Sequence, residues 1–417
     1  MKIVWILNHY AVFPTSPGGT RHYYLAKYLY ENGWKAYIIT ASIEHNTGNS
    51  LISKNKKYEV KYYNEIPFLL LRTPKYKTNN LKRIWNIFSY TIKVLLPQYT
   101  KILPKPDVII GSQVHPFAAL AGVLLSRRYH VPFIFEVRDL WPQSLIDMGS
   151  ITSHSMQAKI LRLLERWLYN NAQCIVTTLP RASDYITNLG ISENKIKYIP
   201  NGVDIEEFPL SPPHEGQGLF KLMYFGAHGS ANDLEHLIDA MAVLKDKKFS
   251  RNIKLYLIGD GPLKEKLMQK TNDLHLNNVV FQDPIPKNEI PYIASKADAF
   301  VIMVRDLPGL YRYGISMNKI FDYMSAGRPI LIAINISENP IEKACCGITV
   351  NAENPEKLAD AIEQLSSMPQ YKLIELGDNG RKYIEKNHNY KMLGGVLADI
   401  LDGVLMKASN QITPENT

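Results

Sequence analysis

The chain has 417 residues, of which 46% are hydrophobic and 21% charged, and a formal net charge of +9. A chain of this length forms roughly two to three domains, and its composition excludes a disordered, collagen-like or disulfide-stabilised protein. Its cysteines, Cys174, Cys345 and Cys346, lack the spacing of a zinc site and favour a reducing cytosol. The apolar run at 3–7 is too short for a signal peptide, and the longest apolar stretch, 108–126, is interrupted by polar residues and a proline. We therefore expect no membrane-spanning segment.

The net charge is unevenly distributed along the chain. Residues 1–200 contain 25 Lys and Arg against 11 Asp and Glu, a net charge of +14, whereas the remainder contains 23 against 28, a net charge of −5. The positive excess is greatest in residues 72–105, which contain no acid. Such asymmetry indicates an anionic surface or ligand that faces the first half.

Within 72–105, apolar residues including Trp85 recur at helical spacing among the basic ones. A basic amphipathic helix is typical of proteins that bind anionic membrane surfaces. A helix packed on the core with a solvated basic face has the same pattern and is the alternative. Nucleic acid is disfavoured as a partner, because the chain has neither zinc pairs nor RNP-like aromatics.

Strands and helices alternate through both halves, which is typical of parallel, doubly wound sheets. In the first half the pattern predicts strands at 2–7, 35–40, 107–111, 133–137 and 174–178, and helices at 21–31, 117–128 and 156–170. In the second half it predicts strands at 221–225, 253–258, 279–281, 299–303 and 330–333, and helices at 233–245, 263–270, 289–296 and 319–326.

We therefore expect an α/β protein with two Rossmann-like, doubly wound domains that face each other across a cleft. The first domain is expected at 1–200 and the second at 219–380, joined by a Pro- and Gly-rich linker at 201–218. Residues 381–417 are expected to form a helix that packs back on the first domain, followed by a tail. Ligands of such sheets bind where the carboxyl ends of the strands meet.

The most informative segment is 313–329, with the sequence YGISMNKIFDYMSAGRP. A glycine and Ser316 permit a tight loop before a helix that begins near Asn318. Lys319 and Asp322 are three residues apart and so share one face of the first helical turn. A phosphate bound there would meet free backbone N–H groups and the Lys319 ammonium, and Asp322 would accept hydrogen bonds from the ribose hydroxyls. An exposed helix with a surface Lys–Asp pair is the alternative.

Two glycine-rich turns accompany this segment. Gly18 and Gly19 precede the first predicted helix, and adjacent glycines let backbone N–H groups approach a phosphate or sugar, although an ordinary turn has the same pattern. The second turn, 257–262, contains Gly259 but lacks the third glycine of a dinucleotide fingerprint. NAD is therefore disfavoured as a ligand.

Segment 313–329 resembles the signature of the retaining glycosyltransferases of family 4, which have the GT-B fold. Further landmarks resemble those of the family and follow in its order: Gly18-Gly19, 200–204 and 257–262. Residues 8–10 and 136–142 are similar to the WbuB-like branch, which makes bacterial surface polysaccharides. The resemblance spans essentially the whole chain.

The resemblance implies transfer of a sugar, with retention of its anomeric configuration, from a nucleotide donor that we expect to be UDP-linked. The expected acceptor is linked to a polyprenyl diphosphate, and the expected sugar is an N-acetylated hexosamine or a deoxy relative. Such enzymes work without a bound metal, and the chain has no Asp-x-Asp metal signature, so no cofactor is expected. The protein would act in O-antigen- or capsule-type synthesis, peripherally on the cytoplasmic face of the inner membrane.

The resemblance also carries a set of binding residues to this chain. The expected donor-binding residues are Gly18, Gly19, Gly226, His228, Arg312, Ser316, Asn318, Lys319 and Asp322. The nucleotide base is expected near Gly259, Asp283 and Ile285.

The chain departs from the family pattern at two points. The first of the family's two acidic residues falls on Gly314, which leaves open how the hydroxyls of the donor sugar are held. The strand-end Arg/Lys pair is replaced by residues 226–230, so Lys319 and Arg312 become the candidates that neutralise the diphosphate.

The candidate catalytic residues are His115, Arg138, Asp139 and Lys319. The first three follow predicted strands, and Arg138-Asp139 match the position where the family places a histidine near the reacting carbon. Asp139 would orient the acceptor hydroxyl or act as an auxiliary base, and Lys319 would stabilise charge on the leaving phosphate. A turn histidine at 115 and a local ion pair at 138–139 are the alternatives.

Two other functions fit parts of the sequence. A nucleotide-sugar 2-epimerase has the same two-domain plan but would not need the basic residues 72–105. A non-catalytic protein that binds membranes or polyanions would explain the charge but not residues 316–329.

Overall fold

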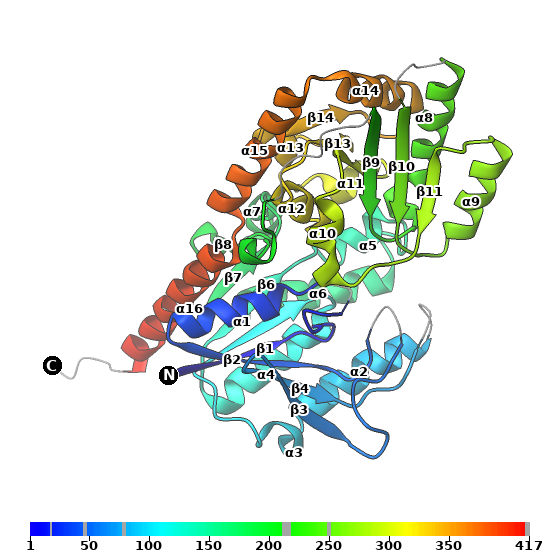
Figure 1. The fold of residues 1–417 in the computed structure, drawn as a ribbon. Coiled ribbons are helices and arrows are strands. Elements are labelled where there is room, and N and C mark those ends of the chain that lie inside the picture. The colour runs from blue at the N-terminus through cyan, green and yellow to red at the C-terminus, as the bar shows by residue number, and fades with distance from the viewer. Residues whose placement is uncertain (17–18, 45–47, 77–80, 211–217, 248–251, 413–417) are drawn as a thin grey trace. The chain divides into compact units, whose positions relative to one another are not determined.

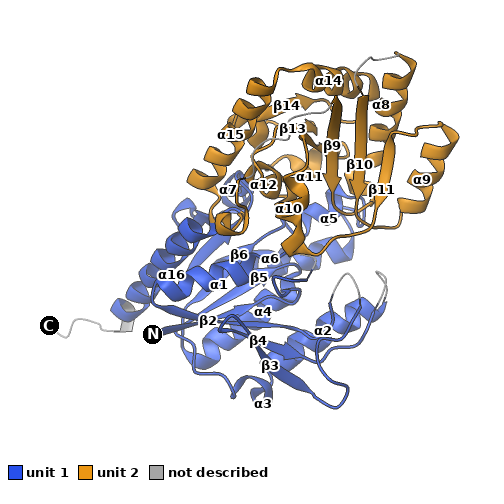
Figure 2. Ribbon diagram, in the orientation of Figure 1, with its two compact units in different colours: residues 1–200, 390–417 blue, residues 201–389 orange. Residues whose placement is uncertain are grey.

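The computed structural model describes residues 1–16, 19–44, 48–76, 81–210, 218–247 and 252–412 (Figure 1). Two compact units make up the chain: unit 1 comprises residues 1–200 and 390–417, and unit 2 comprises residues 201–389 (Figure 2). Each unit has its own sheet, in which most neighbouring strands are parallel. The predicted fold class, α/β with two doubly wound sheets, is confirmed.

Unit 1 contains an eight-stranded sheet in the order β3-β4-β2-β1-β5-β6-β7-β8. Its strands are β1 (Lys2–Leu7), β2 (Trp34–Ala41), β3 (Tyr58–Tyr63), β4 (Ile66–Leu71), β5 (Val108–Gln113), β6 (Phe133–Val137), β7 (Cys174–Thr177) and β8 (Ile196–Tyr198). Its helices are α1 (Arg21–Glu31), α2 (Leu81–Leu95), α3 (Pro97–Thr100), α4 (Pro116–Tyr129), α5 (Gln143–Asp147), α6 (Met156–Asn171), α7 (Ala182–Asn188), α16 (Tyr390–Ile412) and the 3-10 turn η1 (Glu193–Lys195).

Unit 2 contains a six-stranded parallel sheet in the order β11-β10-β9-β12-β13-β14. Its strands are β9 (Leu219–Phe225), β10 (Asn252–Ile258), β11 (Val279–Gln282), β12 (Ala299–Met303), β13 (Ile330–Ala333) and β14 (Gly347–Val350). Its α-helices are α8 (Leu234–Asp246), α9 (Lys264–Asp273), α10 (Ile290–Ala294), α11 (Pro308–Tyr311), α12 (Asn318–Ser325), α13 (Pro340–Lys343), α14 (Pro355–Ser367) and α15 (Gln370–Asn387). Its 3-10 turns are η2 (Ile205–Glu207), η3 (Ser230–Asn232) and η4 (Lys287–Glu289).

The sheet of unit 1 is covered on both faces, which explains why β1 is a continuous apolar run. Val4 and Ile6 pack into the core that α1 and α16 help to form. Trp5 points to the opposite face, where its ring contacts Tyr129 of α4 at 5.1 Å between centroids. Helices α1 and α16 therefore cover one face of the sheet, and α4 belongs to the layer on the other (Figure 1).

The unit boundaries differ from the expected domain boundaries at two points. The described part of the expected linker packs within unit 2, where Val203 and Phe208 are buried in its core. Residues 381–389 also belong to unit 2, because Arg381 of α15 donates hydrogen bonds to the carbonyls of Phe208 and Ser325. The C-terminal helix, α16, therefore begins only at Tyr390.

One feature that the periodicity analysis missed is the antiparallel hairpin of β3 and β4. Its two-residue loop has positive φ at both positions, 43° at Asn64 and 68° at Glu65. Such loops usually contain glycine, and a glutamate at the second position gives no hairpin signal in the sequence.

Glu165 provides a prediction about stability in unit 1. The carboxyl is 2% exposed and accepts hydrogen bonds from Tyr185 at 3.1 Å and Tyr169 at 3.3 Å. Burial raises the pKa of Glu165 to about 8, so the folded state keeps a proton that the unfolded state has lost above its ordinary pKa. The free energy of unfolding is therefore highest below the pKa that Glu165 has in the unfolded chain, and it falls as the pH rises from there toward 8.

We expect Glu165→Gln to remove this loss of stability at high pH. The variant should be more stable than the wild type at pH 8 by about 2 kcal/mol, with little difference at pH 5, in urea unfolding. An equal difference at the two pH values would show that the ionisation of Glu165 is not its cause.

Candidate active site

Three segments of unit 2 meet at the carboxyl edge of its sheet, where the strand order reverses between β9 and β12. A Cβ atom at Gly226, directly after β9, would lie 3.2 Å from Nζ of Lys319. A Cβ atom at Gly259, directly after β10, would lie 1.9 Å from the carbonyl oxygen of Gly226 and 3.4 Å from Nε2 of His228. The structure thus brings together four of the predicted site residues, Gly226, His228, Gly259 and Lys319.

Lys319 is held by neutral groups. Its ammonium donates hydrogen bonds to the Tyr224 hydroxyl at 3.0 Å and to Oδ1 of Asn232 at 2.7 Å, and lies 4.6 Å from the centroid of the Tyr224 ring. Among the described residues, no carboxylate forms a salt bridge with Lys319, so the surface Lys–Asp pair with Asp322 is not formed. Burial lowers the pKa of Lys319 to about 7.

The start of α12 lies beside this ammonium. Met317 occupies the N-cap position and provides no side-chain hydrogen bond to the first turn, which begins at Asn318. The loop before it is fixed by the Asn201 amide, which donates to the Ser316 carbonyl at 2.9 Å, and by Gly314, whose φ of 93° favours glycine. An uncapped helix start with an adjacent ammonium is suited to bind a phosphate group.

His228 is fully buried, and neither of its ring nitrogens has a hydrogen-bond partner within the described part of the chain. Its ring lies 6.0 Å from that of Phe281, edge to face. Burial lowers the pKa of His228, and the charges of Lys264 and Lys319 lower it further. A buried polar group without a partner is costly, so this imidazole needs a water molecule or a ligand to complete its hydrogen bonds.

Gly259 provides a sharp test of this site, because its φ is 151° and an added Cβ would collide with the Gly226 carbonyl. We expect Gly259→Ala to weaken nucleotide binding at least about tenfold, since backbone strain of this kind costs 1–3 kcal/mol. Gly229→Ala is the matched control, because that glycine has a φ of −115° and open space around it. Equal effects of both variants on calorimetric binding would contradict this placement of Gly259.

The other predicted donor residues do not join this cluster through contacts that the structure records. Arg312 is exposed, and the exposed Asp283 pairs with Lys264 at 2.9 Å. Ile285 packs against the hydrophobic core. Asp322 is partly buried, and burial raises the pKa of its carboxyl. Gly18 lies outside the described residues.

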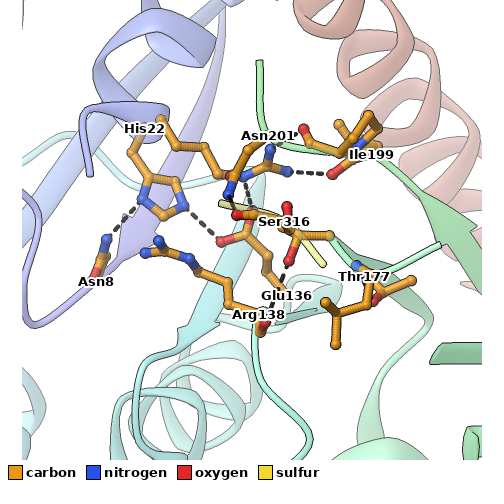
Figure 3. A network of polar contacts seen from close by, with 12 residues as sticks. Asn8, His22, Glu136, Arg138, Thr177, Ile199, Asn201 and Ser316 are labelled. Atoms are coloured by element: carbon orange, nitrogen blue, oxygen red, sulfur yellow. Dashed lines mark hydrogen bonds and ion pairs between the residues drawn. The ribbon is translucent and has the colours of Figure 1, made fainter. Parts of the chain in front are cut away.

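In unit 1, a buried polar network occupies the carboxyl edge of the sheet (Figure 3). Glu136 of β6 accepts hydrogen bonds from Nε of Arg21 at 2.8 Å and from His22 at 2.7 Å, and His22 contacts Asn8 at 2.8 Å. Arg21 also donates to the carbonyls of Ile199, at 2.9 Å, and Pro200. This network joins β1, α1 and β6 to the backbone of residues 199 and 200.

Glu136 is thus a structural carboxylate. Burial alone would raise the pKa of Glu136, but its contacts with His22 and with the permanent charge of Arg21 outweigh this effect and hold the pKa well below its usual range.

His115 is also a buried residue, with 2% of its surface exposed. Its Nε2 hydrogen-bonds to Nδ1 of His9 at 2.7 Å, and the His9 ring stacks on Tyr90. Burial lowers the pKa of His115 to about 3, and the nearby Arg83 charge acts in the same direction. The imidazole is therefore uncharged at neutral pH and is poorly suited to act as a general base.

The predicted residues Gly19, Arg138 and Asp139 lie nearer to solvent. A Cβ atom at Gly19 would lie 3.3 Å from Nη2 of Arg138, so the backbone of that turn approaches the guanidinium closely. Arg138 is partly exposed and Asp139 is exposed. Arg138 and Asp139 are thus ionisable groups at this edge that a ligand can reach.

The sequence gives no sign of the contacts that Arg21, Tyr224 and Asn232 make in the structure. Arg21 opens the predicted helix at 21–31, and nothing in its spacing indicates that it is buried. A guanidinium that is only 1% exposed needs a buried carboxylate partner, here Glu136. Tyr224 lies inside the predicted strand at 221–225, and nothing in its spacing indicates that its hydroxyl contacts Lys319.

Comparison with known proteins identifies the family. A family model described as Glycosyltransferase Family 4 matches residues 18–207, and one described as Glycosyl transferases group 1 matches residues 220–368. The two models thus match both units. The chain belongs to glycosyltransferase family 4.

The similar proteins agree with this assignment. Probable glycosyltransferase WbjE of Pseudomonas aeruginosa is 20% identical over 328 residues, which cover 75% of this chain and 77% of that protein. Anabaena Alr3699/HepE, solved in complex with UDP and glucose, has a TM-score of 0.67 at 16% identity, with 97% of this chain and 100% of that chain covered. WaaG, a glycosyltransferase involved in lipopolysaccharide biosynthesis, has a TM-score of 0.66 at 15% identity, with 96% and 100% covered. This transferase therefore has the GT-B fold.

Proposed function

We propose that this transferase moves a sugar from a UDP-sugar to a polyprenyl-diphosphate-linked acceptor, with retention of configuration, in the synthesis of a bacterial surface polysaccharide. The observation that carries the proposal is the Lys319 ammonium, which has no carboxylate partner in the described chain and lies beside an uncapped helix start and the Gly226 and Gly259 turns. A diphosphate is the ligand best suited to these groups. UDP is favoured because HepE, which shares the fold, was solved with UDP.

The proposed reaction exchanges one bond at the anomeric carbon for another. The bond from this carbon to the β-phosphate oxygen breaks, the acceptor hydroxyl oxygen bonds to the same face, and its proton passes to the departing diphosphate. Lys319 and the N-terminus of α12 would stabilise the charge that develops on the phosphate. Arg138 and Asp139 are proposed to orient the acceptor, and Arg312 and Ser316 to contact the donor.

The proposed donor is an N-acetylated hexosamine or a deoxy relative, as in the WbuB-like branch that the sequence resembles. The names of the similar proteins support the polysaccharide role, since WaaG acts in lipopolysaccharide biosynthesis. The transferase would work without a metal or other cofactor. A nucleotide-sugar 2-epimerase and a non-catalytic polyanion-binding protein receive no support from the family models.

Peripheral membrane binding is proposed from α2, which buries Val94 but leaves a row of other apolar side chains exposed. It buries Asn86 and Tyr90, which hydrogen-bond to Thr73 at 2.9 Å and to the Ile39 carbonyl at 2.7 Å. Its apolar row is exposed: Leu81 81%, Ile84 50%, Trp85 60%, Phe88 39% and Ile92 50%. Among the described helices, none is long and apolar enough to cross a bilayer. A basic helix with an exposed apolar row is suited to lie in the interface of an anionic leaflet.

The function is tested by incubating the purified protein with a panel of UDP-sugars and membrane lipid extract. We expect release of UDP together with a glycosylated lipid whose anomeric configuration, by NMR, matches that of the donor. UDP release only with extracted lipid supports transfer. Conversion of a UDP-sugar to its epimer, or an inverted product, would contradict the proposal.

Asp322→Asn tests the nucleotide site. The substitution replaces one of the two acceptor oxygens with an NH2 donor and removes the negative charge, so it should weaken UDP binding about tenfold, measured by calorimetry. The stability of the protein should stay the same or rise, because a partly buried carboxylate is removed. Unchanged affinity would show that Asp322 does not contact the nucleotide.

A further inference from the structure

A second helix of unit 1 exposes an apolar row that its sheet does not bury. In α6, Met156, Ile160 and Leu163 follow one another at helical spacing and are 69%, 57% and 70% exposed. The opposite face of α6 buries Leu168 and Tyr169 in the core. These three side chains are thus available to a surface outside the molecule.

Helices α2, α4 and α6 form one continuous layer, because α4 packs against both of its neighbours. The ring of Phe88 on α2 lies 4.9 Å from that of Phe117 on α4. Arg127 of α4 lies 5.4 Å from the ring of Trp167 on α6 and donates to Asn171 at 2.6 Å. Leu124 of α4, 38% exposed, adds to the apolar surface of this layer.

The charges of this layer have one sign. The basic residues of the three helices are Lys82, Arg83, Lys93, Arg127, Arg128, Lys159, Arg162 and Arg166. Their only acidic residue is Glu165, which is buried. A surface that combines exposed apolar rows with uniformly basic charge complements an anionic lipid leaflet, whereas a protein partner in an aqueous complex would usually meet a mixture of charges.

Topology places this layer at the edge where the candidate acceptor groups lie. A crossover helix that joins parallel strands starts at the carboxyl edge of the sheet, so α2, α4 and α6 all begin there. Arg138 and Asp139 follow β6 at the same edge. A lipid-linked substrate in a leaflet bound by this layer would therefore have its head group near these residues.

We propose that the membrane-binding surface extends from α2 across α4 to α6, so that an anionic leaflet engages two apolar rows at once. This inference rests on the proposed peripheral membrane binding and deepens it. Two separate insertions bind a bilayer more stably than one, and they also fix the orientation of unit 1 on the surface. The carboxyl edge of the sheet is then held toward the lipid head groups.

The inference is tested by sedimentation of the full chain with phosphatidylglycerol and with phosphatidylcholine vesicles. We expect the wild type to pellet with phosphatidylglycerol, and the double variant Ile160→Ser/Leu163→Ser to partition about tenfold less, because two apolar side chains no longer enter the interface. Met406→Ser on α16 is the matched control, since Met406 is 66% exposed on the opposite layer, and should bind like the wild type. UDP binding should be the same in all three proteins.

Three results would overturn the inference. Equal partitioning of the double variant and the wild type would restrict the surface to α2. Absence of wild-type binding to phosphatidylglycerol would remove the membrane surface altogether, while UDP binding would still test the transferase proposal separately. A wild-type dimer that Ile160→Ser/Leu163→Ser dissociates would assign the row to a second copy. Should the double variant unfold, Lys159→Ser/Arg166→Ser provides the same comparison through charge.

Discussion

Lys319→Ala is expected to lower kcat/KM for UDP-sugar transfer by about 10²–10³-fold, the usual loss when a group that stabilises a developing negative charge is removed. The physical reason is that Lys319 is the ammonium that Tyr224 and Asn232 hold beside the start of α12. The measurement is steady-state release of UDP. Lys266→Ala is the matched control, because Lys266 is 67% exposed and pairs with Glu235 on the surface. A loss smaller than about threefold in Lys319→Ala would remove Lys319 from the reaction.

The pH dependence of UDP binding identifies the same group. In the protein without nucleotide, the pKa of Lys319 is about 7. A bound diphosphate raises this pKa, so the protein must take up a proton when UDP binds. The charged form is lost as the pH rises above 7, so UDP affinity should fall up to about tenfold per pH unit from 7 toward the bound-state pKa. Calorimetry in buffers of different ionisation enthalpy measures this uptake. The dependence should disappear in Lys319→Ala, and its persistence there would assign it to another group.

Arg21→Met is expected to cost about 3–5 kcal/mol of the free energy of unfolding, the largest effect on stability that we predict. The substitution leaves the Glu136 carboxylate buried without its permanent countercharge and removes the donors to the carbonyls of Ile199 and Pro200. Urea unfolding at pH 7 measures the change. Arg181→Met breaks an ion pair whose side chains are 43% and 44% exposed, and should cost less than about 1 kcal/mol.

A double variant separates the ion pair from the loss of packing. Replacing both partners with apolar residues, as in Arg21→Met/Glu136→Leu, should recover part of the stability, because no uncompensated charge stays buried. If Arg21→Met cost no more than Arg181→Met, the network of Figure 3 would not be what joins β1, α1 and β6.

The regular elements of the fold could be predicted because parallel strands buried on both faces are continuous apolar runs. The predictions of β1, α1, β6, β12 and β13 match the structure residue for residue. The periodicity did not predict β3 and β4, whose hairpin loop contains glutamate in place of the usual glycine. It also did not predict α14 and α15 in the C-terminal part of the chain. Residues 381–389 belong to unit 2 because Arg381 contacts the carbonyls of distant residues. The periodicity of the sequence cannot reveal such contacts.

The part of the candidate site that could be predicted consists of glycines directly after strands and of a residue at the start of a helix. Gly226, Gly259 and Lys319 meet because each follows a strand or opens a helix at the same edge of the sheet. His115 illustrates the limit, since its place after a strand gives no indication that it packs against His9 and Tyr10 and becomes buried. Side-chain contacts between remote segments, such as Lys319 with Tyr224, need coordinates.

The measurement that tests the central claim most directly is calorimetric titration of the purified protein with UDP, GDP, ADP and NAD, in parallel with Lys319→Ala. The account predicts that UDP binds most tightly and that the variant binds it at least about tenfold more weakly. Binding of none of the four, or tightest binding of NAD, would contradict the assignment of the unit 2 edge as a UDP-sugar site.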